Sequence, residues 1–149
     1  MSLKSQVEAG IKDAMRAKNQ DTLRALRAIK SLILLEETKG AATGDLSAEE
    51  ELKLLTKAAK QRRESAEIYK DQGRADLLEK EEAELAIIEQ FLPKQLTEAE
   101  IEERLKVIIA QVGASAPSDM GKVMGVATKE LAGVAEGRVV SATVKRLLA

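Results

Sequence analysis

Residues 61–95, QRRESAEIYKDQGRADLLEKEEAELAIIEQFLPKQ, decide the fold because they contain one helical pattern, its break, a second helical pattern and the end of that second one. Gly73 interrupts the first pattern where glycine can take the left-handed conformation that closes a helix. Asp76, followed by Glu79, predicts the start of the next helix. Pro93 ends it, because proline disfavours helix at the residue before it. The stretch therefore predicts a helical hairpin and then an exit from a first domain.

Composition extends this prediction to the whole chain. The 149 residues are 44% hydrophobic, 33% charged and 1% aromatic, with one Tyr and one Phe, so Leu, Ile, Val, Ala and Met must build the core. Two prolines and an abundance of Ala, Leu, Glu and Lys favour helix throughout. We expect an all-α fold, with an N-terminal four-helix domain of two helical hairpins and a small C-terminal three-helix domain.

The residue types that are missing exclude several kinds of site. The chain has no cysteine and no histidine, which removes the thiol nucleophile and the commonest metal ligand and general base. We expect no cofactor and no metal. No apolar run approaches the ~18 residues of a membrane-spanning helix, and the N-terminus lacks the apolar core of a signal peptide. The sequence predicts a cytoplasmic protein without a membrane partner.

The first domain is expected over residues 1–92. Ser2 caps a first helix that ends near Ala17, Asp21 begins a second helix that Gly40 closes, and Ser47 begins a third. Ser47 forms a capping box with the glutamate three residues later. The apolar stripes of the first two helices include Met15 and Leu34. On the third helix Arg62 falls on the apolar stripe, and we expect its stem on the core edge and its guanidinium outside.

The second domain is expected over residues 96–149, after a short connector that contains Pro93. Thr97 and Glu100 form a capping box that begins the fifth helix, and Ser118 caps the sixth. Residues 133–137 form the last turn before a seventh helix. The apolar positions of these three helices predict a small separate core, made of Ile101, Leu105, Ile108, Ile109, Val112, Met120, Met124, Ala127, Leu131, Val140, Val144, Leu147 and Leu148.

Glycines on the sixth helix form the first candidate site. Gly121 and Gly125 lie four residues apart, with Thr128 continuing a small-residue face, so another backbone can approach closely. The partner is either a packed helix or a nucleic-acid backbone. The start of this helix, at Ser118, also suits a phosphate because its N–H groups are unpaired, although Asp119 already places a negative charge there.

Basic side chains of the last two helices form the second candidate site. The sequence places five of them there, and they either bind nucleic acid or belong to ordinary solvated surface: Lys122, Lys129, Arg138, Lys145 and Arg146. Another basic set, predicted to be ordinary surface, lies on the first two helices: Arg16, Arg24, Arg27 and Lys30. The carboxylates are predicted to form solvated, ion-paired helix faces instead of metal or acid–base sites: Glu49, Glu50, Glu51, Glu79, Glu81, Glu82 and Glu84.

Several of these motifs together resemble those of a known family. The chain is similar to the YqeY family, also called GatB/YqeY-domain proteins, over essentially its whole length. The segments that carry the resemblance are RES through Tyr69, GRADL from Gly73, residues 81–85, FLPKQL from Phe91 and DMGKVMG from Asp119. The last segment resembles the tail domain of the GatB component of the glutamine-dependent tRNA amidotransferase, although the turn at 133–137, GVAEG, lacks the basic residue usual in that domain.

Three functional hypotheses remain, and the resemblance implies the first two. The first is a non-catalytic helical module that binds tRNA or assists an amidotransferase or another translation-related protein. The second is a carbon–nitrogen ligase with glutamine as amide donor, and the third is a protein-interaction adaptor that acts through the N-terminal helical hairpins. Glutamine hydrolysis needs an activated nucleophile, and amide formation needs an ATP-phosphate site. The sequence has no cysteine and no phosphate-cradling glycine loop, so we expect no catalytic residue and no such activity from the chain alone.

Overall fold

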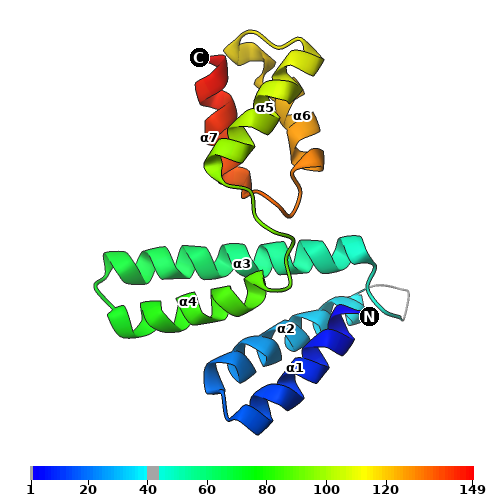
Figure 1. Ribbon diagram of the computed structural model, residues 1–149, viewed down its shortest axis with the longest axis vertical. Helices are drawn as coiled ribbons and strands as arrows, with labels where there is room; N and C mark the ends of the chain where they lie inside the picture. The colour runs from blue at the N-terminus through cyan, green and yellow to red at the C-terminus, as the bar shows by residue number, and fades with distance from the viewer. Residues whose placement is uncertain (1, 40–43) are drawn as a thin grey trace. The chain divides into compact units, whose positions relative to one another are not determined.

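A computed structural model describes residues 2–39 and 44–149 (Figure 1). Over these residues the chain forms seven α-helices and one short 3-10 helix, and no strand. The predicted all-α fold is confirmed. The helices are α1 Leu3–Ala17, α2 Gln20–Lys39, α3 Ala48–Asp71, α4 Ala75–Glu89, α5 Glu98–Val112, α6 Met120–Glu130 and α7 Gly137–Leu148, with the 3-10 helix η1 at Pro117–Asp119.

Contacts divide the chain into two compact units, Met1–Leu92 and Pro93–Ala149. We call them the first unit and the second unit. Whether each unit folds independently, as the predicted domains at 1–92 and 96–149 require, stays a prediction.

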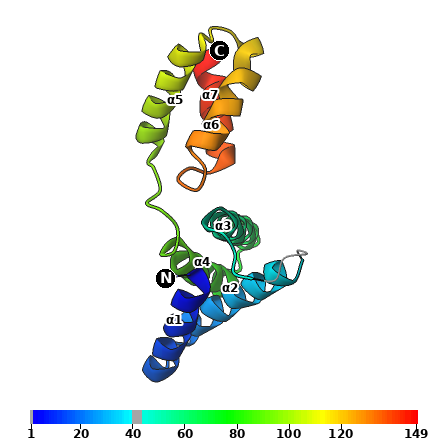
Figure 2. The ribbon, with the colours of Figure 1, turned by 90° about the vertical axis from the view of Figure 1, so that its right-hand side faces the viewer.

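The first unit consists of two helical pairs. α1 packs on α2, α3 packs on α4, and α2 also packs on α4; Figure 2 looks along α3 and shows α4 and α2 beside it. Val7, Ile29, Ala59 and Ile88 lie in one shared core. A Cβ added to Gly10 of α1 would lie 2.9 Å from Leu26 Cδ1, so this glycine lets α1 approach α2 closely. The same core contains Leu3, Leu26, Ile33, Leu54, Leu55 and Ala58.

Two hydrophobic residues of the predicted stripes lie outside this core. Met15 is 56% exposed and Leu34 is 42% exposed. Both residues lie at the edge of their apolar stripe, and the neighbouring helices cover only part of its width. The spacing of apolar residues therefore predicted a wider buried face than the structure has.

The ends of the first four helices agree with the sequence only in part. α1 ends at Ala17 as predicted, and Gly73 has a φ of 68°, the left-handed conformation expected of it. Asp76 does not start α4, which begins one residue earlier without a side-chain cap. The Asp76 carboxylate instead accepts two hydrogen bonds from the Arg74 guanidinium, at 3.1 and 3.2 Å.

The second and third helices begin on different kinds of cap. Asn19, not Asp21, caps α2, because its side-chain oxygen accepts the Thr22 N–H at 3.1 Å. The capping box predicted at Ser47 and Glu50 is present, with the Ser47 N–H donating to the Glu50 carboxylate at 2.7 Å. The predicted closure of α2 at residue 40 lies outside the described residues.

In the second unit, α5, α6 and α7 pack on one another. Leu105, Val123 and Val144 have no exposed surface and form the centre of its core. The capping box of Thr97 and Glu100 begins α5 as predicted. At the start of this unit a backbone hydrogen bond joins the segment before α5 to the segment before α7, because the Leu96 N–H donates to the Val134 carbonyl at 2.8 Å. No helix among the described residues has the length and apolarity needed to cross a membrane.

Candidate nucleic-acid interface

The solvent face of α6 contains the two glycines predicted to allow close approach. α6 buries Val123 and Ala127, and both Gly121 and Gly125 lie on the opposite, exposed side. A Cβ added at either glycine would have no atom within 4 Å. Tight packing against another helix of the described chain therefore does not account for these glycines. The face remains open to a partner whose backbone comes close.

Two lysines border this face. Lys122 and Lys129 are seven residues apart, so they share one side of α6, and both are exposed. Within residues 2–39 and 44–149, neither lysine has a carboxylate within ion-pair distance. Their charges are thus not compensated by a local pair. Together with Gly121, Gly125 and Thr128, they form what we call the α6 face.

The start of α6 differs from the prediction. Ser118 lies within η1 and does not cap α6. The Asp119 carboxylate instead accepts the N–H groups of Ser115 and Ala116, at 2.9 and 3.1 Å. These two hydrogen bonds, with a smaller contribution from the charge of Lys122, hold the pKa of Asp119 below its usual value. A fixed negative charge at this helix start disfavours a phosphate there.

The remaining predicted cations lie on α7. Arg138 and Lys145 are seven residues apart and exposed, on the side opposite the buried Val140 and Val144. Arg146 differs, because its guanidinium donates to Glu102 Oε1 of α5 at 3.3 Å. This hydrogen bond is the main reason that the pKa of Glu102 is lowered. The structure therefore uses Arg146 to join α5 to α7.

A group that the sequence assigned to the surface is buried in the first unit. Glu84 of α4 retains only 9% of its side-chain exposure. Arg24 Nε of α2 donates to Glu84 Oε1 at 2.8 Å, and Arg62 of α3 approaches Glu84 Oε2 at 3.1 Å. Arg62 also pairs with Glu81 at 3.2 Å, and Glu81 has 15% side-chain exposure. We call these four residues the Glu84 network.

The Glu84 network corrects three predictions. Glu84 and Glu81 do not belong to a solvated face, Arg24 is not ordinary surface, and the guanidinium of Arg62 turns toward α4 instead of outward. A signal existed in the sequence, because Glu81 and Glu84 precede the buried Ile88 by seven and four residues and thus share its helix face. Two carboxylates on an apolar stripe imply cationic partners from neighbouring helices.

The other three members of the predicted surface set, Arg16, Arg27 and Lys30, fit the prediction of ordinary surface. Arg16 lies 3.9 Å from Asp13 with both side chains well exposed, and Lys30 lies 3.5 Å from Glu8 across α1 and α2. Arg27 is exposed. Exposed pairs of this kind contribute little to stability, about 0–1 kcal/mol each.

Comparison with known proteins gives a family match and two relatives. The family model described as "Yqey-like protein" matches residues 4–148. A protein of Pyrenophora tritici-repentis named "Altered inheritance of mitochondria protein 41, mitochondrial" is 32% identical over 124 residues, which cover 79% of this chain and 67% of the relative. A protein of the same name from Clavispora lusitaniae is 33% identical over 116 residues, which cover 76% and 66%. The matches span about two thirds of each relative.

Proposed function

Because this chain belongs to the Yqey-like protein family, we propose that it is a non-catalytic helical module that binds tRNA through the α6 face and the exposed cations of α7. It does so alone or beside an enzyme of tRNA-dependent amidation. The observation that carries the proposal is the α6 face itself. Gly121 and Gly125 present no side chain that would keep a partner away, and Lys122 and Lys129 stand beside them without a carboxylate in the described part of the chain.

This face suits a phosphate backbone. Lysine binds phosphate as a point charge, and each phosphate that is neutralised releases a counterion. The two exposed glycines would let the sugar-phosphate chain lie directly against the helix. Lys145 and Arg138 are two further exposed cations of the second unit, on α7. Such contacts position a nucleic acid without reading its bases.

The aromatic residues favour a folded RNA over a single strand. Binding of single strands depends on bases that stack on aromatic side chains. The chain has one Tyr and one Phe, at positions 69 and 91, and both precede the second unit. Without an aromatic platform, the second unit would recognise shape and backbone, as proteins that bind structured RNA do. Binding is therefore weak, tolerant of sequence and sensitive to salt.

Charge reversal tests the proposal. We expect the triple variant Lys122→Glu, Lys129→Glu and Arg138→Glu to abolish binding of unmodified tRNA in a low-salt titration. The matched control reverses Lys12 and Arg27, which are exposed on the first unit. Arg24 is unsuitable as a control because its reversal would disrupt the Glu84 network. Equal loss in both variants, or loss in the control alone, would contradict the assignment to the second unit.

A cytoplasmic location also stays a prediction. Both relatives have the word mitochondrial in their names. A mitochondrial location of this chain would leave the proposed binding chemistry unchanged, because tRNA presents the same phosphate backbone in either compartment.

A further inference from the structure

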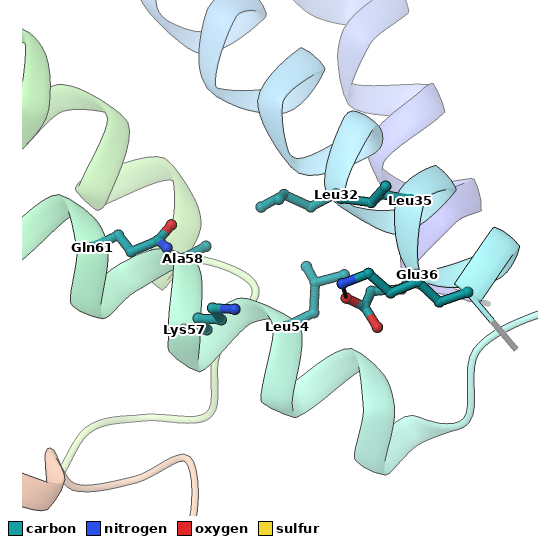
Figure 3. A pocket seen from close by; sticks show the side chains of 8 residues that line it. Leu32, Leu35, Glu36, Leu54, Lys57, Ala58 and Gln61 are labelled. Atoms are coloured by element: carbon teal, nitrogen blue, oxygen red, sulfur yellow. Dashed lines mark hydrogen bonds and ion pairs between the residues drawn. The ribbon is translucent and has the colours of Figure 1, made fainter.

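A groove lies between α2 and α3 in the first unit, and none of its lining residues belongs to the Glu84 network or to the proposed tRNA surface. Figure 3 shows its lining side chains, which come from the C-terminal half of α2 and from residues 54–61 of α3. Its volume is about 100 Å³. A cavity of about 150 Å³ holds benzene, so this one has room for one aliphatic side chain.

The inner surface of the groove is apolar and partly exposed. Leu54 of α3 is 8% exposed, while Leu35 of α2 is 53% exposed. Leu32 and Ala58 complete the apolar lining. Leu35 offers apolar surface that an inserted aliphatic side chain would remove from water, which favours binding.

The rim of the groove is positively charged. Lys39 is paired with Glu36 at 3.1 Å, so the one carboxylate of the lining is already neutralised. Lys57 on the opposite rim has no carboxylate within ion-pair distance in the described chain, and neither has Lys60 one turn further along α3. An acidic group approaching the groove would therefore meet uncompensated positive charge.

The shape and charge of the groove exclude three kinds of occupant: a β-strand, a nucleic acid and a second copy of this chain. Both walls are helices with internally bonded backbones, so no strand edge is available for a β-strand to join. A nucleic acid would leave the apolar lining unused. Two copies of this chain related by a two-fold axis would bring Lys57 and Lys60 of both copies together, which like-charge repulsion opposes.

We propose that the groove between α2 and α3 binds an acidic amphipathic helix of another protein. One aliphatic side chain of that helix inserts between Leu35 and Leu54, and an aspartate or glutamate about one turn away pairs with Lys57. Helices that bind in grooves are recognised by apolar anchors spaced three or four residues apart. The proposal concerns the first unit alone, so it stands or falls independently of tRNA binding.

Selection from a library tests the chemistry of the occupant. The full chain is used to select from a displayed library of 15-residue helical peptides in which the positions of one face and its flanks are randomised. Enriched peptides should carry aliphatic residues three or four apart, flanked by Asp or Glu. Enrichment of basic flanks, or of peptides without an aliphatic anchor, would overturn the proposal.

Variants of the chain then locate the binding. The affinity of the best peptide, made synthetically and labelled for fluorescence anisotropy, should fall about tenfold or more with Leu35→Ser and several-fold with Lys57→Glu. The matched controls are Met15→Ser and Lys12→Glu, which change an exposed apolar residue and an exposed lysine of α1. These controls should leave the affinity unchanged.

Two further results would contradict the proposal. One is a peptide affinity that neither Leu35→Ser nor Lys57→Glu changes, because the peptide then binds outside the groove. The other is a dimer in sedimentation equilibrium that Leu35→Ser abolishes, because the groove would then belong to a contact between two copies. Since Leu35 is half exposed, its change to serine is not expected to unfold the first unit, and circular dichroism checks this directly.

Discussion

Replacing Glu84 by glutamine tests how the first unit holds its two helical pairs together. The change keeps the shape of the side chain and removes its charge. The Glu84 carboxylate forms ion pairs with Arg24 of α2 and Arg62 of α3. One neutral substitution therefore weakens ion pairs to two other helices. We therefore expect the loss to appear as reduced stability of the whole first unit, not as fraying of α4 alone.

The expected magnitude depends on how exposed the two arginines are. Removing one partner of a fully buried ion pair costs about 3–5 kcal/mol. Here the arginine side chains keep 44% and 31% of their exposure, so water can solvate much of their charge after the change. We expect a loss of about 1–3 kcal/mol in the free energy of unfolding. For a unit of this size, each kcal/mol lowers the melting temperature by about 4–8 °C.

Urea unfolding of the full chain is the assay. Tyr69 is the one tyrosine and lies in α3, so its fluorescence reports on the first unit without a signal from the second. Glu82→Gln is the matched control, because Glu82 lies two residues away and is exposed. A cycle that combines Glu84→Gln with Arg62→Gln measures the coupling between the two side chains.

The control sets the result that would refute this reasoning. Surface substitutions usually change stability by less than about 0.5 kcal/mol. If Glu84→Gln costs no more than Glu82→Gln, the buried carboxylate contributes nothing that a neutral amide cannot replace. If the double-variant cycle shows no coupling, Arg62 and Glu84 do not stabilise each other.

Three other predictions follow from the helix ends, the connector and the missing nucleophile. The Thr97 N–H and hydroxyl hold the pKa of Glu100 below its usual 4.5, so the ionised carboxylate stabilises the fold above that pH and this stabilisation is lost as pH falls through the lowered pKa. Glu100→Gln should therefore lower the melting temperature at about pH 7 and leave it unchanged at about pH 2. An equal effect at both pH values would contradict the capping box. Limited trypsin digestion should cut first after Lys39 or near Lys94, both exposed, and first cuts inside helices would contradict two separable domains. The purified chain should show no glutaminase or ATP-dependent ligase activity, and steady hydrolysis of glutamine that one Ser or Lys substitution abolishes would contradict this.

The sequence predicted the helices well because their end signals are local. The capping boxes at Ser47 and Thr97 each require two side chains three residues apart, and the left-handed glycine at 73 requires only itself. Asp76 failed as a start signal because Arg74 competes for its carboxylate, and a sequence pattern does not rank competing partners.

The candidate sites were harder to predict because they depend on distant parts of the chain. Burial of Glu84 follows from Arg24 and Arg62, which lie 60 and 22 positions earlier. Packing also decides the exposure of Gly121 and Gly125. The sequence pattern of two glycines four residues apart is the same whether or not another helix covers them. Periodicity shows which residues share a face, and only the fold shows what lies against that face.

The cations of the second unit set the expected salt dependence of tRNA binding. Arg146 is held by Glu102. Under the proposed function, Lys122, Lys129 and Lys145 would supply three phosphate contacts, and Arg138 would supply a fourth by exchanging its interaction within the chain for a phosphate. With three or four contacts and a slope of about −0.7 to −0.9 per contact, affinity should fall roughly 20- to 150-fold between about 50 and 200 mM salt.

The salt dependence of tRNA binding is the measurement that tests tRNA recognition by the α6 face most directly. Titration of tRNA with the full chain should give a slope of log affinity against log salt of about −2 to −4. The paired variant Lys122→Glu and Lys129→Glu should lose complex formation even at about 50 mM salt. No complex at low salt, or a complex whose affinity is indifferent to salt and to these two lysines, would contradict the proposal and favour a protein partner instead.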